Sequence, residues 1–356
     1  MFFATTLLLF TAIGPQAGSG STSTSNVPAY DGGIPKFDYE GGLAQGRAYG
    51  FCLGQDAALR KLVQQHPDLA EVTAKARVRF DDAFGASAAN IERWMRRAPR
   101  EFEQLEKKLK EQLDIEIGKL DFSRSDALDM LALVERRALG QQVDAAILQP
   151  LLYCHPRYRL QPELELADGF TQAVSSDGAN TQAIAFRFTL PASWSRKDEL
   201  PLGSALHYAS EAGRGDEFAM LGAQRVMSAE QAPTDAQIEQ EIRRLIATGE
   251  MQLYLPPGIE TVEQTSRALD GQPGYTRLLR TRFEEAGRKK YRLVREFGCF
   301  IRGVVVSLAL GVEESHPVDA KVDEALIEKR LQQRIKHWKA CAFAVAESFR
   351  FERKRR

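Results

Sequence analysis

The sequence predicts an α+β protein, in which an all-helical bundle is followed by an antiparallel-sheet sandwich. Residues 53–153 are poor in Ser, Gly and Pro and rich in helix-forming residues, with apolar side chains at spacings of three and four. From about residue 165 the pattern changes to the alternation of apolar and polar residues that is typical of strands. A chain of 356 residues is long enough for two cores of ordinary size.

The N-terminus has the character of an export signal. The first thirty residues carry no charged side chain, and a short apolar run over residues 2–13 ends at Gly14 and Pro15. The run is too short to span about 30 Å of hydrocarbon, but it has the length of a signal-peptide core. No Lys or Arg precedes it and no A-x-A site follows it, so a misassigned start or a buried N-terminal segment is the alternative. We therefore expect a signal-like leader over residues 1–25 and a periplasmic or secreted protein, with a cytoplasmic protein as the alternative.

A helical bundle is expected over residues 51–155, after a linker rich in Gly and Ser at residues 26–50. The clearest helix runs from about Pro99 to Gly118. It carries one apolar stripe, formed by Phe102, Leu105, Leu109, Leu113 and Ile117. A second helix begins at a cap, Ser123 or Ser125, and ends near Gly140. Shorter helices are expected over residues 57–65, 69–84 and 88–96, with breaks at His66-Pro67 and at Gly85.

The second half, residues 165–352, is expected to form the sandwich. Strands are predicted near residues 183–190, 204–210, 217–226, 264–269, 275–283 and 291–297, and a long apolar strand over 299–310. A helix begins after Thr234, where Gln237 completes a capping-box pattern, and ends at Gly249. A single long helix is predicted over residues 318–347, before a basic tail at residues 353–356.

Several sequence segments of this half resemble the PsbP-like (DcrB-related) α/β/α sandwich family. They are the segment from Phe186 to Trp194, the turn from Gly271 to Tyr275, and a terminal helix that closes on Ser348-Phe349-Arg350-Phe351. The resemblance covers about residues 165–352, whereas the helical part resembles no family. The family includes photosystem accessory proteins, bacterial periplasmic proteins and chaperones of type VI secretion effectors. The resemblance thus implies a binding or scaffolding module more often than an enzyme.

Four cysteines are disulfide candidates: Cys52, Cys154, Cys299 and Cys341. None has the C-x-x-C spacing of a zinc or thioredoxin-type site. We expect Cys52–Cys154 to join the ends of the bundle and Cys299–Cys341 to join a strand to the terminal helix. Four buried thiols are the alternative.

No pattern of catalytic, metal-binding or nucleotide-binding residues emerges from the sequence, and no cofactor is expected. The sequence has no G-x-S-x-G elbow, no phosphate-binding loop and no H-E-x-x-H spacing. Cys154-His155 are neighbours whose side chains diverge. Glu313, Glu314, His316 and Asp319 are interpreted as a polar loop before a helix, and a metal site there is the weaker hypothesis. Arg214-Gly215-Asp216 fits a tight hairpin better than an adhesion motif.

The charge of the chain argues against a general nucleic-acid partner. Lys and Arg number 48, and Asp and Glu also number 48. Positive charge is concentrated only in the C-terminal tail, which consists of Arg353, Lys354, Arg355 and Arg356. This tail could make a weak contact with an anionic surface or form a solubilising terminus.

These observations favour a non-catalytic exported protein that binds or scaffolds a protein or envelope partner. One alternative is an intracellular chaperone-like module that holds apolar segments of a secreted effector on an exposed sheet face. The other is a hydrolase with a site at the cleft between bundle and sandwich. A convergent cluster of titratable groups would favour the hydrolase.

Overall fold

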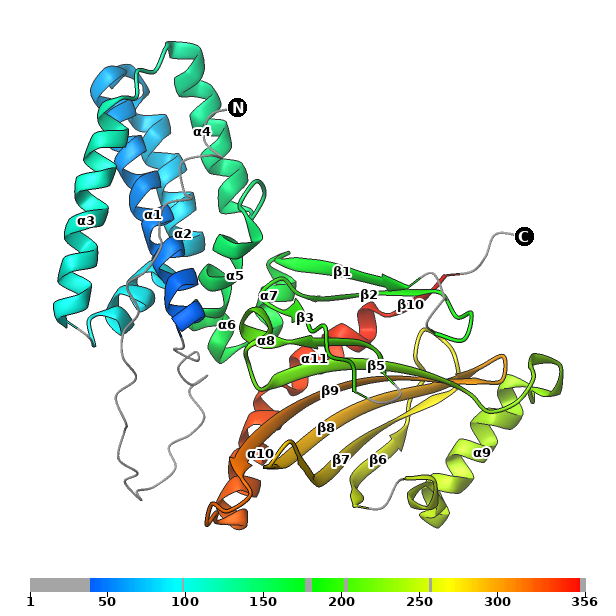
Figure 1. Ribbon diagram of the computed structural model, residues 1–356. Helices are drawn as coiled ribbons and strands as arrows, with labels where there is room; N and C mark the ends of the chain where they lie inside the picture. The colour runs from blue at the N-terminus through cyan, green and yellow to red at the C-terminus, as the bar shows by residue number, and fades with distance from the viewer. Residues whose placement is uncertain (1–38, 98, 177–180, 202–203, 256–257, 353–356) are drawn as a thin grey trace. The chain divides into compact units, whose positions relative to one another are not determined.

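The computed structural model describes residues 39–352, apart from residues 98, 177–180, 202–203 and 256–257 (Figure 1). Within this range the chain divides into two compact units at residues 159 and 160. The first is all helical, and we name its residues 39–159 the helical unit. The second contains all the described strands, and we name its residues 160–352 the sheet unit. The α+β class predicted from the sequence is confirmed. The leader 1–25 and the tail 353–356 lie outside the described residues.

Five main helices build the helical unit. They are α1 (Tyr39–Gln65), α2 (Ala70–Met95), α3 (Pro99–Gly118), α4 (Arg124–Ala138) and α5 (Ala145–Tyr153), with a short 3-10 turn at Pro67–Leu69 and the short helix α6 (Pro156–Leu160). The bounds of α3 are those predicted, and Phe102 and Leu109 of its apolar stripe are buried. Helix α4 begins at a complete capping box, in which the Ser123 side chain accepts from the Asp126 N–H and the Asp126 carboxylate accepts from the Ser123 N–H.

Helix α1 begins at Tyr39, inside the predicted linker, so residues 39–50 are helical. Two glycines of α1 allow close packing against α3. A Cβ atom on Gly50 would lie 3.3 Å from Leu109 Cδ2, and one on Gly54 would lie 3.4 Å from Leu113 Cδ2. The stripe of small residues lets α3 approach the α1 backbone, and this packing compensates for the low helix propensity of glycine. The predicted linker over residues 26–50 is therefore wrong for its last twelve residues.

Helix α2 is continuous through Gly85, where a break was predicted. A glycine inside a helix costs only about 1 kcal/mol relative to alanine. On either side of it, Phe80, Phe84, Ile91 and Trp94 bury their side chains. The break at His66-Pro67 is confirmed, because Pro67 opens the 3-10 turn between α1 and α2.

The sheet unit contains two antiparallel sheets. The larger has the order β3 (Ser195–Arg196), β4 (Ser204–Ala209), β5 (Glu217–Arg225), β9 (Val304–Pro317), β8 (Arg288–Ile301), β7 (Gly274–Glu285) and β6 (Ile259–Ser266). The smaller has the order β1 (Thr171–Ser176), β2 (Phe186–Pro191) and β10 (Arg350–Phe351). Short helices α7 (Glu163–Ala167) and α8 (Ser210–Gly213) lie between strands, and 3-10 turns occur at Ala229–Gln231 and Glu250–Tyr254.

The long apolar strand predicted over residues 299–310 is divided between β8 and β9. Both Arg302, with φ of 49°, and Gly303, with φ of 76°, adopt left-handed conformations that form a tight turn, so Ile301 pairs with Val304. Positive φ at both central residues is the requirement of a two-residue hairpin with a type I′ turn. The apolar run continues through the turn because both strands are buried on one face, and periodicity alone therefore hides the boundary.

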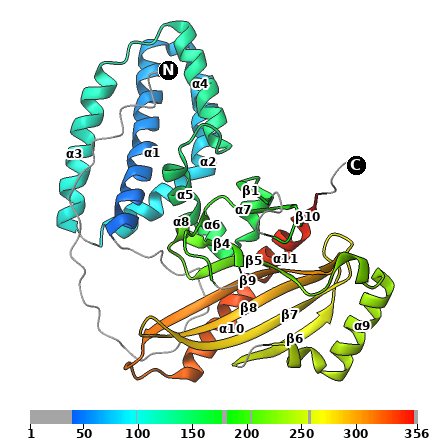
Figure 2. The same cartoon turned by 45° about the vertical axis from the view of Figure 1, so that its right-hand side comes forward.

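Helices cover both faces of the large sheet (Figures 1 and 2). On one face, Phe297, Val306 and Leu308 pack with Cys341 and Val345 of α11 (Lys339–Ser348). On the same face, Ile327, Leu331 and Ile335 of α10 (Glu324–His337) pack against Leu293 and Val312. The single long helix predicted over residues 318–347 is thus two helices, which meet at Trp338. At Trp338, φ of −81° and ψ of 0° mark the end of α10. The centroid of its indole ring lies 5.6 Å from that of Trp194.

The opposite face is covered at its β6 end by α9 (Asp235–Thr248). The backbone carbonyl of Ile246 in α9 accepts from Gln264 Nε2, and Gln264 shares its face with Arg277 and Glu296 of the neighbouring strands. The capping box of Thr234 and Gln237 predicted from the sequence is formed.

The free edge of β6 is partly closed by a side chain. Gln252 donates from Nε2 to the Ile259 carbonyl at 2.7 Å and accepts from the Thr261 N–H at 3.0 Å. These are the two bonds that a neighbouring strand would make, so Gln252 substitutes for a strand at this end of the edge.

Candidate functional site

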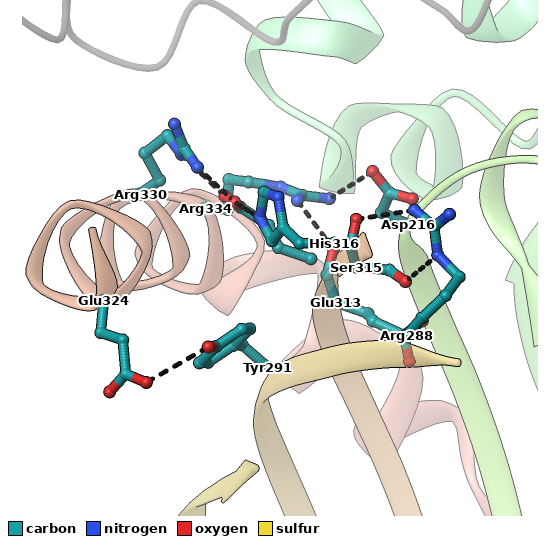
Figure 3. A network of polar contacts seen from close by, with 10 residues as sticks. Asp216, Arg288, Tyr291, Glu313, Ser315, His316, Glu324, Arg330 and Arg334 are labelled. Carbon is teal, nitrogen blue, oxygen red and sulfur yellow. Dashed lines mark hydrogen bonds and ion pairs between the residues drawn. The ribbon is translucent and has the colours of Figure 1, made fainter. Parts of the chain in front are cut away.

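The main cluster of titratable groups lies where the β8–β9 hairpin meets α10 (Figure 3). We name it the polar network. Arg334 of α10 is at its centre: Nη2 lies 2.6 Å from Glu217 Oε1 and 3.8 Å from an Asp216 oxygen, and Nη1 donates to the Glu313 carbonyl at 3.1 Å. One guanidinium thereby joins α10 to the start of β5 and to β9. The network also includes Arg288, Tyr291, Glu314, Ser315, His316, Glu324 and Arg330.

Glu217 is the most deeply buried acid of the polar network. It accepts from Ser210 Oγ at 2.7 Å as well as from Arg334. Burial by itself would raise the pKa of the Glu217 carboxyl, but the charge and hydrogen bond of Arg334 outweigh it and the pKa is lowered. Glu217 is therefore ionised at neutral pH, where it is a weak base.

The turn before Glu217 is strained. Glu211, Ala212 and Gly213 have φ of 50°, 57° and 88°, which are left-handed values that cost a non-glycine residue about 1–2 kcal/mol each. The Ala212 N–H donates to the Ser193 carbonyl at 2.8 Å, and Ser210 is held by Glu217. The polar network and this turn thus support each other.

The same turn contains Arg214-Gly215-Asp216. A Cβ atom on Gly215 would overlap the Ser210 side chain. Packing against Ser210 therefore explains the glycine of this tripeptide without an adhesion function.

The four residues considered as a metal site do not converge. Glu313, Glu314 and His316 lie within β9, which extends to Pro317, so they are part of a strand and not of the predicted loop. Successive side chains of a strand point to opposite faces. Glu314 accepts two bonds from Arg330 at 2.6 and 3.0 Å, whereas Glu313 pairs with Arg292. In the part of the chain that the structure describes, no three potential ligands are grouped for a metal ion.

A second set of ion pairs lies on the face of the sheet opposite α10. Arg277 Nε and Glu296 Oε2 are 2.5 Å apart, and each side chain is only about a tenth exposed. Tyr275 donates to Glu296 at 3.4 Å, and burial raises the pKa of its hydroxyl. Arg277 lies over the Tyr275 ring and Arg292 lies over the rings of Phe218 and Phe283. These cations are engaged by acids and aromatic rings of the same unit.

The disulfide candidates form neither predicted pair in the structure, where Cys52, Cys299 and Cys341 carry free thiols. Burial raises the pKa of the Cys52 and Cys299 thiols to about 12 and raises that of Cys341 well above its ordinary value. A protonated thiol is a poor nucleophile. Cys299 and Cys341 both lie in the main hydrophobic core, so they behave there as small apolar side chains.

The neighbours Cys154 and His155 make structural contacts. The Cys154 carbonyl accepts from Asn90 Nδ2 at 3.1 Å, and His155 Nδ1 accepts from the Arg157 N–H at 3.2 Å. The His155 ring also packs against Tyr158 in a tilted arrangement, with 4.6 Å between ring centroids. Helix α5 and the turn into α6 are held by these bonds.

Sequence reasoning missed the arginines that organise the polar network. Arg334 and Glu217 are 117 residues apart in the chain, and no spacing rule connects them. The available signal was the placement of Arg330 and Arg334 one helical turn apart, which puts them on one face of α10.

Searches for related proteins gave results for the fold alone. No protein-family model matches the chain, and no curated protein matches it. Among solved structures, cyanobacterial PsbP (CyanoP) from Synechocystis is 17% identical with a TM-score of 0.29, and the match covers 51% of this chain and 92% of that chain. LpqN of Mycobacterium tuberculosis, involved in cell envelope biogenesis, is 15% identical with a TM-score of 0.28, and the match covers 54% and 98%. A Bacteroides thetaiotaomicron protein is 11% identical with a TM-score of 0.27, covering 52% and 50%.

The matches to PsbP and to LpqN each cover about half of this chain. Structural similarities with TM-scores this low give no information about what the chain binds. Among the described helices, none combines the length and the apolar character needed to cross a bilayer.

Proposed function

We propose that this chain is a non-catalytic protein of the periplasm or cell envelope that binds or scaffolds a protein or envelope partner. The observation that supports the proposal best is that acids of the polar network have partners within the same unit. Glu217, Glu313 and Glu314 are each held by an arginine of the same unit. An arginine keeps its charge at every relevant pH, so each of these carboxylates has a permanent cationic partner within its own unit.

The chaperone alternative receives less support. It expects a contiguous apolar sheet face, whereas the exposed large apolar side chains among the described residues are spread over many elements. They are Val72, Val78, Ile115, Leu128, Leu139, Leu160, Leu200, Val226, Val262 and Val318. Single exposed apolar residues are normal on any protein surface.

Cell fractionation combined with affinity capture tests the proposal. The full chain with a C-terminal tag is expressed in a bacterium with an outer membrane, and captured from periplasmic and membrane extracts at several salt concentrations. We expect the chain in the periplasmic or envelope fraction, together with a partner in fixed stoichiometry. Recovery from the cytoplasm in complex with a secreted effector would support the chaperone alternative instead. Turnover of ester, peptide or glycoside substrates would support the hydrolase.

The basic tail has its own test within this proposal. Four substitutions, Arg353→Gln, Lys354→Gln, Arg355→Gln and Arg356→Gln, remove its charge. We expect the full chain to sediment weakly with vesicles that contain anionic lipid, less at high salt, and the substituted chain not to do so. Equal sedimentation of the two chains would assign no membrane role to the tail.

A further inference from the structure

Glu165 of α7 is a buried acid that the polar network does not involve. Only 4% of the residue is exposed. Its Oε1 accepts from the Ser193 N–H at 2.7 Å and its Oε2 contacts Ser193 Oγ at 2.8 Å. The carboxyl therefore fastens α7 to the turn that follows β2.

No described cation contacts this carboxyl. From the turn after β2 it faces Ser193 and the Ala192 backbone, which are neutral. From α11 it faces the Cys341 thiol, whose pKa the charges of Glu165 and Glu163 raise further. Burial raises the pKa of Glu165 from its ordinary 4.5 to about 7, and the hydrogen bonds from Ser193 and Ala192 offset this only in part.

Glu217 provides a comparison within the same unit. Both glutamates are buried and both bond a serine hydroxyl, but Glu217 also has Arg334 and its pKa is lowered. The difference between the two sites is the cation. Ser193 donates to both carboxyl oxygens of Glu165, but two neutral donors do not replace a cation, so burial favours the protonated form of this carboxyl.

We propose that the Glu165–Ser193 contact is a proton-linked latch: α7 is held on the turn after β2 while Glu165 carries a proton, and detachment of α7 releases that proton. Once detached and solvated, Glu165 ionises at its ordinary value. Opening is therefore favoured by rising pH in the window between about 4.5 and about 7, and does not change further above it, where the closed form is ionised as well. Within that window the open fraction should rise about tenfold per pH unit.

Hydrogen exchange of the full chain tests the latch. Protection of peptides that cover residues 161–170 and 190–196, corrected for the intrinsic pH dependence of exchange, should fall across the window and level off above it. In Glu165→Gln, which keeps an acceptor for the Ser193 N–H but cannot ionise, protection should be independent of pH. Glu163→Gln is the matched control on the same helix and should behave as the unchanged chain does.

Direct titration of Glu165 by carbon-13 NMR of its carboxyl gives a second measurement that does not depend on the folding of any variant. A midpoint near 7 supports the latch, and a midpoint near 4.5 overturns it. A fall in protection that persists in Glu165→Gln also overturns it. Ser193→Ala removes the hydroxyl that stabilises the ionised carboxyl, and should move the midpoint to higher pH.

Discussion

Gly298 of β8 shows how one missing side chain shapes the sheet. The Tyr275 ring lies close to it, and a Cβ atom there would overlap the ring. We expect Gly298→Ala to lower the free energy of unfolding by about 1–3 kcal/mol, because the ring must leave a packed position. The control is Gly46→Ala in α1, where a Cβ atom would meet nothing within 4 Å and helix propensity improves. Urea unfolding measures both, and equal effects would contradict the packing argument.

Arg334 should be the most costly single residue of the polar network to replace. Arg334→Met leaves Glu217 buried without its cation, which costs about 3–5 kcal/mol at neutral pH. Arg330→Met breaks a more exposed pair and should cost no more than about 1 kcal/mol.

The pH dependence of Arg334→Met has a definite sign. In the unchanged chain the lowered pKa of Glu217 contributes stability that is present above its ordinary pKa and is lost as pH falls. In the variant, only the hydrogen bonds from Ser210 and the backbone oppose burial, so we expect that pKa to rise and acid to stabilise the folded state relative to neutral pH. The difference between the two chains, measured by denaturant unfolding, should therefore shrink on acidification. A constant difference would show that Arg334 acts through packing alone.

The cysteines allow a test by peptide mapping without reduction. We expect all four to be recovered as thiols, and expect Cys154, Cys299 and Cys341 to react with an alkylating reagent only after unfolding because they are buried. Recovery of Cys52–Cys154 or Cys299–Cys341 as a linked peptide after periplasmic expression would restore the disulfides expected from the sequence.

At the scale of elements, the edge of β6 should depend on Gln252. Gln252→Ala leaves the Ile259 carbonyl and the Thr261 N–H open to another chain. We expect increased self-association at high protein concentration, measured by sedimentation velocity, because an unpaired edge is a template for strand addition. Gln104→Ala on the exposed face of α3 is the matched control. Equal behaviour of the two variants would show that α9 or the rest of the edge suffices.

Helices were predictable from the sequence where one face is apolar and the other charged. The bounds of α3 and the cap of α9 follow from such local patterns. The turn at Arg302-Gly303 and the break at Trp338 were not predictable, because the apolar pattern continues through both. The turn depends on strand pairing, and the break lies at a ring contact with Trp194. The candidate site was accessible only in part: Glu313, Glu314 and His316 were noticed, but the arginine partners of the two acids, Arg292 of β8 and Arg330 of α10, were not.

At the scale of the whole molecule, the two units should separate by proteolysis. We expect limited digestion to cut within residues 156–180 and to leave a helical and a sheet fragment. Proline and glycine residues there interrupt both the helical and the strand spacing of apolar residues. Residues 39–159 and 160–352, expressed separately, should each unfold cooperatively in circular dichroism. Protection of 156–180 together with cleavage inside α3 would show that the units are one cooperative body.

The packing of α3 on a glycine stripe has a consequence for how the helical unit comes apart. Helix α3 packs mainly against α1, through Leu109 and Leu113 above Gly50 and Gly54, and its opposite side carries charged residues. Helix α3 is thus attached to the unit mainly by a single row of apolar contacts with α1, whereas α2 packs against α1, α4 and α5. Under a pulling force, or in low denaturant, α3 should peel away first while α1, α2, α4 and α5 stay together, so the unit would lose its structure in layers.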